Sequence, residues 1–244
     1  MKMLVCVSKT PETTTKIKLN GDATELDTAG VNYIMNPYDE WYALVRAIEV
    51  KEVGGGSVTL LNVGPADNKS VITKGLAVGA DDAIHVVTDE TDRLFIARQI
   101  AAQAEGYDLI FFGKETIDYN GSEVGAMVAE LLDIAYVGDA SGMELDGNTA
   151  RVTRDIEGGV EVVEVATPLA VSSAKGLAEQ RIPNMRGIMM AKRKPYKTVE
   201  PVGAEPATRV VSYELPPEKT EVKLIDPENM DELVRLLHEE AKVI

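Results

Sequence analysis

Apolar runs alternate with helix-like patterns along the first 140 residues, and no other feature constrains the fold as strongly. The runs are "MLVCV", "SVTLLNVG", "AIHVV" and "DLIFFG". Near-continuous runs of this kind are typical of parallel strands that are covered on both faces. Between two of them, Trp41, Leu44, Val45 and Ile48 recur at the spacing of one helix face. The alternation predicts an α/β fold with a doubly wound, mostly parallel sheet.

The first of these helices has a predicted start and a predicted end. Asn36 is the expected N-cap and Pro37 the first helical residue. Asp39 and Glu40 would follow in the first turn, where carboxylates complement the helix dipole. The glycines at 54–56 then mark the helix end.

The pattern changes after residue 140. "GMELDGNTARVTRDIEGGVEVVEV" has short alternating runs around two turn signals, which predicts hairpins and an antiparallel extension of the sheet. "TPLAVSS" resembles one more buried strand. Residues 199–222, rich in Pro and Glu, indicate an extended tail, and a last helix is expected from Asp226 onward. Residues 175–198 carry one acid, Glu179, and seven basic residues: Lys175, Arg181, Arg186, Lys192, Arg193, Lys194 and Lys197.

Composition limits the partners and the chemistry. A net charge of −15 over 244 residues disfavours nucleic acid or an anionic membrane as a partner of the whole surface. Cys6 is the only cysteine, so no disulfide frame and no CxxC pair exists. No stretch approaches the roughly 20 apolar residues of a membrane span. The first residues lack a signal or transit pattern, so we expect a cytoplasmic location without membrane insertion.

The stretch "GKETIDYNGSEVGAMVAELL", residues 113–132, follows an apolar run and leads into a helical pattern. Its unpaired N–H groups could hold a phosphate beyond the carboxyl end of a strand. Alternatively, the loop only turns the chain, with Ser122 capping the helix and Glu123 complementing its dipole. It matches neither a Walker A loop nor GxGxxG, so the spacing leaves both interpretations open.

No catalytic constellation is recognisable. The chain lacks GxSxG, HExxH and any pair of nearby histidines. His85 lies in a strand-like run and His238 in the last helix, where packed or surface roles are common. A stand-alone enzyme is therefore not expected.

Five motifs, in order, resemble the beta subunit of electron-transfer flavoproteins from about residue 3 to residue 202. "NPYDEWYALVRAIEVKE" resembles that family's helix start, and "AVGADDAIHV" a second element. "GKETIDYNGSEVGAMVAELL" is similar to its nucleotide loop, "VTRDIEGGVEVVEVATP" to its hairpin, and "RIPNMRGIMMAKRKP" to its protruding recognition loop.

The resemblance implies a fold and a role. Residues 1–202 would form an adenine-nucleotide-hydrolase-like (Rossmann-like) domain, including a recognition loop at 173–195. Residues 203–244 would form a C-terminal arm and helix that pack on an alpha subunit in a heterodimer. The alpha subunit holds most of one FAD, and the beta subunit binds AMP. Electrons pass from acyl-CoA dehydrogenases or similar enzymes, as in fatty acid beta-oxidation, to a membrane quinone reductase.

The same resemblance implies site residues. AMP contacts would fall on Cys6, Asn36, Pro37, Tyr38, Asp39, Val63, Gly113, Thr116, Asp118, Tyr119, Asn120, Gly121, Ser122, Glu123 and Val124. Tyr38 and Thr13 match positions near the flavin, although Thr13 replaces an aromatic. Glu123 stands where many members have Gln. Dehydrogenase docking would use Met185, Arg186, Ile188, Met189, Lys192 and Arg193.

Two of these roles have simpler alternatives. Asp155 matches a carboxylate that pairs with an arginine of the partner subunit, but a solvated hairpin charge is the commoner fate of an Asp beside a turn. Residues 183–195 could be an amphipathic surface helix that places Ile188 and Met189 in the core.

Two other functions remain open. Bifurcating relatives bind a second FAD in place of AMP and tend to carry "DGDTAQVGP" at the loop. "DYNGSEVGA" keeps Val124 and Gly125 of that pattern and departs elsewhere, which favours AMP. A stand-alone adenine-nucleotide-binding domain of the same fold would leave the basic segment at 175–198 without a role.

Overall fold

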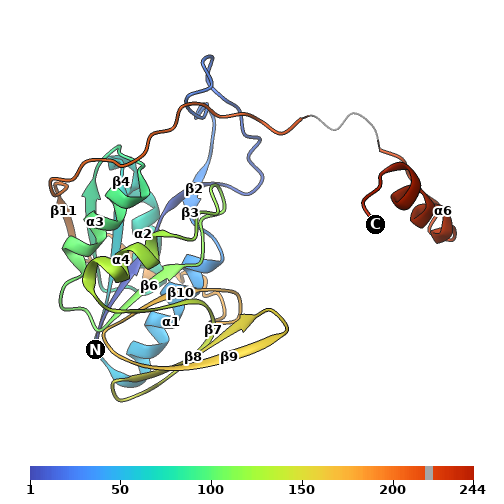
Figure 1. Ribbon diagram of the computed structural model, residues 1–244. Coiled ribbons are helices and arrows are strands. Elements are labelled where there is room, and N and C mark those ends of the chain that lie inside the picture. Colours follow the sequence, from blue (N-terminus) through green and yellow to red (C-terminus); the bar gives the residue numbers. More distant parts are fainter. Residues whose placement is uncertain (218–221) are drawn as a thin grey trace. The chain divides into compact units, whose positions relative to one another are not determined.

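The computed structural model describes residues 1–217 and 222–244. The strands of its large sheet are β1 Lys2–Cys6, β4 Ser57–Gly64, β5 Asp82–Val87, β6 Leu109–Gly113, β7 Ala135–Asp146, β8 Thr149–Ile156, β9 Gly159–Ala166, β10 Leu169–Ser173 and β11 Tyr196–Val199. They lie in the order β11-β5-β4-β1-β6-β10-β7-β8-β9 (Figure 1). Two short strands, β2 Lys9–Pro11 and β3 Tyr33–Met35, form a separate antiparallel pair.

The large sheet is parallel from β11 to β7. β1 pairs in parallel with β4 and β6, and β10 with β6 and β7. β8 is antiparallel to both β7 and β9. These three strands make the hairpin extension, whose β8–β9 end is yellow in Figure 1. The predicted parallel sheet with an antiparallel extension is confirmed.

Helices cover both faces of the sheet. They are α1 Asp39–Gly54, α2 Lys69–Val78, α3 Arg93–Ala104 and α4 Val124–Leu132, with the short helix α5 Met185–Ala191 packed on α2. The short helical segment η1 Ala66–Asn68 precedes α2, and α6 Met230–Arg235 and η2 Leu236–Glu240 follow near the C-terminus of the chain. Alternate residues of β1 point to opposite cores, as the period of two in a strand requires. Met3 and Val5 join the core with α1 and α2, whereas Leu4 and Cys6 join the core with α3 and α4. The sheet is therefore doubly wound.

Three helix starts differ from the sequence prediction. α1 begins at Asp39, and Tyr38 rather than Asn36 occupies its N-cap position, so the predicted Asn36 cap is wrong. α4 begins at Val124, two residues after the expected Ser122. α6 begins at Met230, where the Asn229 side chain accepts from the Glu232 N–H group. In each case the local backbone turn or a capping side chain decides where the helix begins, and the spacing of apolar residues does not reveal either.

The chain divides into two compact units. One consists of residues 1–17 and 28–210, and the other of residues 18–27 and 211–244. Within the second unit, the Tyr213 N–H group donates to the Ala23 carbonyl at 2.7 Å. In the described ranges, no helix combines the length and apolar content that crossing a bilayer requires.

Candidate functional site

The strand order places a switch point beside β1. The chain runs from β1 outward to β4 and β5, then returns to place β6 on the other side of β1. In open α/β sheets, ligands bind beyond the carboxyl ends of strands at such a point. Cys6, Val63 and Gly113 lie at the carboxyl ends of β1, β4 and β6 respectively. The fold therefore brings three predicted AMP contacts to one edge of the sheet.

Asn36 ties two loops together at this edge. Its side-chain amide donates to the Glu115 carbonyl at 3.0 Å and accepts from the Ile117 N–H group at 3.1 Å. The side chain is fully buried, so these bonds also satisfy its polar atoms. Asn36 thus joins the loop before α1 to the loop after β6. This role explains why it does not cap α1.

The entry to α1 is conformationally unusual. Tyr38 has φ of 64°, a left-handed value that is uncommon for a bulky residue, and its side chain is exposed. Such outliers cluster at functional sites, because the surrounding structure must hold them in place. The backbone turn places Asp39 half-buried, where desolvation raises the pKa of its carboxyl group. Pro37, the remaining predicted contact here, is also partly buried.

Glu40 is the most deeply buried carboxyl group of this edge. Its carboxylate accepts the Ser8 N–H group at 2.6 Å, which connects α1 to the end of β1. Burial raises the pKa of Glu40 to about 8 and also raises the pKa of the Cys6 thiol, with Glu40 as a second cause. A Cβ atom at Gly113 would lie 2.8 Å from Glu40 Cγ, so the two elements approach closely.

The loop after β6 exposes backbone donors. Asn120 and Ser122 have φ values of 50° and 54°, so the backbone adopts the left-handed conformation twice just before α4 begins. Among the described residues, the N–H groups of Gly121, Ser122 and Glu123 have no hydrogen-bond partner. Ser122 donates its hydroxyl to Glu115 at 3.4 Å and does not cap α4, so the capping interpretation is wrong. The loop also contains the half-buried or exposed predicted contacts Thr116, Asp118 and Tyr119, and the half-buried Val124 follows as the first residue of α4.

Arg93, at the start of α3, is a residue of this site that the sequence analysis missed. Arg93 Nε lies 2.7 Å from Glu123 Oε1, and its guanidinium lies 5.7 Å from the centroid of the Tyr119 ring. A Cβ atom at Gly121 would lie 2.8 Å from Arg93 Nε, so the glycine leaves room for the guanidinium. α3 and α4 cover the same face of the sheet, which brings Arg93 to the loop. Asp92, directly before Arg93, is the N-cap of α3 and accepts from the Phe95 N–H group, but a cation next to a cap does not by itself indicate a binding site.

This edge therefore has the groups that suit a phosphate. Residues 119–124 contain three backbone donors, lead into the N-terminal end of α4 and have the Arg93 guanidinium beside them. The ion pair with Arg93 offsets the charge of Glu123, which would otherwise repel an anion. In the described part of the chain, no cluster of three or more metal-ligating side chains occurs.

Four of the six predicted docking residues lie on a separate, short helix, α5, and the other two, Lys192 and Arg193, directly follow its end. In α5, the side chains of Met185, Ile188 and Met189 are 74%, 47% and 67% exposed. The alternative that places Ile188 and Met189 in the core is therefore wrong. Ala191 is the buried residue of this helix. Arg186, Lys192 and Arg193 are exposed around the apolar side chains.

Thr13 and Asp155 make no hydrogen bond or ion pair with the other predicted site residues in the described part of the chain. Thr13 is exposed in the connection between β2 and β3. Asp155 is exposed near the end of β8, and no ion pair with another described residue involves it. Its neighbour Arg154 pairs instead with Glu161 on β9, at 2.5 Å.

Comparisons with known proteins agree with this architecture. The family model described as "Electron transfer flavoprotein domain" matches residues 24–203. Electron transfer flavoprotein subunit beta of Bacillus subtilis is 35% identical, with 100% of both chains covered. The subunit of the same name from Homo sapiens is 33% identical over 100% of this chain and 99% of its own. That of Bradyrhizobium diazoefficiens is 34% identical over the full length of both. The chain therefore belongs to the electron transfer flavoprotein family, among its beta subunits.

Proposed function

We propose that the chain forms a heterodimer with an alpha subunit and carries electrons from acyl-CoA dehydrogenase-type enzymes to a membrane quinone reductase. The observation that carries this proposal is the full-length similarity to electron transfer flavoprotein beta subunits. The alpha subunit holds most of the FAD, and this chain supplies a nucleotide edge and a docking helix. The cytoplasmic location predicted from the sequence is part of the same proposal.

Co-purification tests the cofactor content. The gene product that pairs with this chain is expressed with it, and the cofactors are extracted from the denatured complex. One FAD and one AMP per heterodimer are expected. Two FAD molecules without AMP would favour the bifurcating alternative, and a nucleotide-binding chain that retains no partner would favour the stand-alone alternative.

The AMP phosphate is proposed to bind at residues 119–124. The dianion would accept from the N–H groups of Gly121, Ser122 and Glu123, and Arg93 would add a charge-assisted hydrogen bond. Cys6, Val63 and the loop that Asn36 holds would face the adenosine part. AMP is a structural ligand in this proposal and stabilises the heterodimer by mass action.

Two substitutions test the proposed phosphate contact. Glu123→Gln removes a carboxylate and frees the Arg93 guanidinium, so AMP should bind several-fold more tightly. Arg93→Ala should weaken AMP binding by about ten- to a hundredfold, because one charged hydrogen bond contributes roughly 1.5–3 kcal/mol. Titration calorimetry on AMP-depleted heterodimer measures both.

The control for Arg93 is Arg98→Ala, which removes the same charge from the same helix. Arg98 donates to the Glu205 carbonyl and should leave AMP affinity unchanged. Equal affinities in wild type and Arg93→Ala would place the phosphate elsewhere.

Dehydrogenases are proposed to dock on α5. Its exposed methionines are flexible and polarisable, which suits a surface that accepts several partners. The surrounding basic side chains can steer it to an acidic surface although the whole chain is acidic. Met185→Ala should weaken docking by roughly 1–2 kcal/mol, mostly through faster dissociation. Arg193→Glu should slow association and reduce its salt dependence.

Electron transfer from reduced dehydrogenase to the flavin measures both docking variants, with FAD content and melting temperature as controls. Wild-type rates in both, at low dehydrogenase concentration, would contradict docking on α5.

Asp155 is proposed to pair with an arginine of the alpha subunit. It is exposed and has no ion-pair partner among the described residues, so its carboxylate is available. Because exposed pairs contribute only about 0–1 kcal/mol, Asp155→Ala should leave folding intact. Unchanged electron-transfer kinetics in this variant would mean that the charge is merely solvated.

A further inference from the structure

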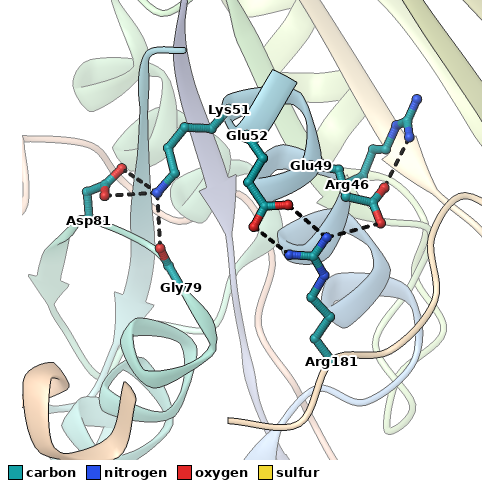
Figure 2. A network of polar contacts seen from close by, with 7 residues as sticks. All are labelled: Arg46, Glu49, Lys51, Glu52, Gly79, Asp81 and Arg181. Carbon is teal, nitrogen blue, oxygen red and sulfur yellow. Dashed lines mark hydrogen bonds and ion pairs between the residues drawn. The ribbon is translucent and has the colours of Figure 1, made fainter. Parts of the chain in front are cut away.

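Arg181 lies where residues 181–194, here named the recognition segment, leave the body of the protein. Its guanidinium donates two hydrogen bonds to Glu52 of α1, Nη1 to Oε1 at 2.8 Å and Nη2 to Oε2 at 2.9 Å. Arg181 Nη2 also lies 3.6 Å from Glu49 Oε1. Figure 2 shows Arg181 reaching up to both carboxylates, which project from consecutive turns of α1.

The network continues along α1. Glu49 also pairs with Arg46, at 3.1 Å, so its orientation is fixed from two sides (Figure 2). The backbone of Arg181 is held as well, because the Trp41 indole N–H group donates to its carbonyl at 3.1 Å. Two parallel hydrogen bonds from a planar guanidinium define direction more strictly than a single ammonium contact. The entry of the segment is therefore fixed in position and in direction.

The other end of the segment is anchored to α2. The Lys194 ammonium group donates to the Leu76 carbonyl at 2.8 Å and to the Ala80 carbonyl, around the C-terminal end of α2. Burial lowers the pKa of Lys194, which agrees with its partly buried position. β11 follows directly and pairs with β5. Both ends of the segment are thus tied to α1 and α2, the helices that pack on one face of the sheet.

Between these two anchors the segment exposes apolar side chains. Ile182, Met185 and Met189 are 89%, 74% and 67% exposed. α5 itself packs on α2 through the buried Ala191, whereas residues 182–184, between Arg181 and α5, include no buried side chain. The order of residues 182–184, and with it the path into α5, therefore depends on the Arg181 anchor. A binding surface that is ordered before contact loses less conformational entropy on association.

We infer that Arg181 is a positioning residue for docking: its bonds to Glu52 and Glu49 hold the recognition segment in the conformation that a dehydrogenase binds. This inference rests on the proposed docking function of α5. Arg181 itself does not touch the dehydrogenase. An exposed ion pair contributes little to global stability, so its effect is on the population of the docking conformation.

The rival explanation is electrostatic steering by the positive charge of Arg181, and three variants separate the two. Arg181→Ala removes both the charge and the bonds. Arg181→Lys keeps the charge but cannot form the two parallel bonds. Glu52→Gln keeps Arg181 and makes the surface less acidic. Positioning predicts slower docking in all three, whereas steering predicts wild-type docking in Arg181→Lys and equal or faster docking in Glu52→Gln.

The experiment uses the heterodimer and an acyl-CoA dehydrogenase of the same organism, reduced with its acyl-CoA. We expect the second-order rate of flavin reduction to fall about three- to tenfold in Arg181→Ala, in proportion to the lost population. A smaller fall is expected in Arg181→Lys and Glu52→Gln. Arg98→Ala serves as the charge-matched control and should react as wild type does.

Hydrogen exchange of the free heterodimer gives a readout without a dehydrogenase. Amides of residues 182–190 should exchange faster in Arg181→Ala, with the strands of the sheet unchanged. Unchanged exchange there, or a faster reaction in Glu52→Gln, overturns the inference. If Met185→Ala also reacts at the wild-type rate, the proposed docking function fails; if only Met185→Ala is slow, the docking function stands and the inference alone is wrong.

Discussion

Glu40 combines a carboxyl group with an almost fully buried position, and this makes the stability of the protein depend on pH. Its folded pKa of about 8 exceeds the ordinary value, because burial disfavours the charged form. The folded state therefore binds the proton more tightly than the unfolded state. As pH rises from the unfolded pKa to about 8, the unfolded state ionises first, and stability falls. Below the unfolded pKa, the carboxyl group of Glu40 is protonated in both states, so stability has its full value and no longer changes with the titration of this group.

Glu40→Gln should remove this pH dependence. Glutamine keeps an oxygen that can accept the Ser8 N–H group, but it has no charge to bury. The variant should gain stability over wild type by on the order of 1 kcal/mol or more near pH 8, and should gain little near pH 5. Urea unfolding at several pH values measures the difference. The exposed Glu130→Gln serves as control, and a constant difference across the pH range would contradict the prediction.

The motif resemblance pointed to residues at this edge of the sheet but not to the contacts that they make. The resemblance named Asn36, yet only the structure shows its two bonds to the loop after β6. Arg93 was missed because its partners Glu123 and Tyr119 are about thirty residues away in the sequence. Periodicity reports which face of an element is buried. It does not report contacts between loops that the topology brings together.

At the scale of elements, long and strongly patterned segments were predictable. The four apolar runs became β1, β4, β5 and β6, and the two turn signals after residue 140 became the connections of β7, β8 and β9. The short elements β2, β3 and β11 were not foreseen. Strands of three or four residues bury too few side chains to leave a pattern, and tertiary pairing decides them.

The packing of α5 against α2 depends on a glycine. A Cβ atom at Gly187 would lie 2.4 Å from the Ala77 carbonyl oxygen, which is closer than any real contact. Gly187→Ala should therefore push α5 away and cost roughly 1–3 kcal/mol, although alanine favours the helix itself. We expect a lower melting temperature and faster exchange in residues 185–191. Gly203→Ala is the matched control, since a Cβ atom there meets nothing within 4 Å.

At the scale of the whole molecule, the negative charge and the basic segment act on different partners. The chain has a net charge of −15, whereas residues 175–198 contain seven of its 25 basic side chains. High salt should slow dehydrogenase docking, because it screens local attraction between the segment and an acidic surface.

The division into two units leads to the last prediction. Residues up to 208 are fastened to the first unit, because Asp92 accepts both the N–H and the hydroxyl of Thr208, at 2.9 and 2.6 Å, while it caps α3. The second unit contains 211–244, which we propose to pack on the alpha subunit. A chain ending at residue 210 should therefore keep its melting temperature within a few degrees but bind the alpha subunit at least about tenfold more weakly.

The melting temperature and the dissociation constant of this shortened chain are measured beside those of the full chain. Thr208→Val in the full chain is the matched control: it keeps the arm but loses the hydroxyl bond to Asp92, and it should bind the alpha subunit normally. If the shortened chain unfolds, residues 211–244 are part of the core of the subunit. If it binds the alpha subunit with full affinity, the interface lies within residues 1–210, and the arm has another role.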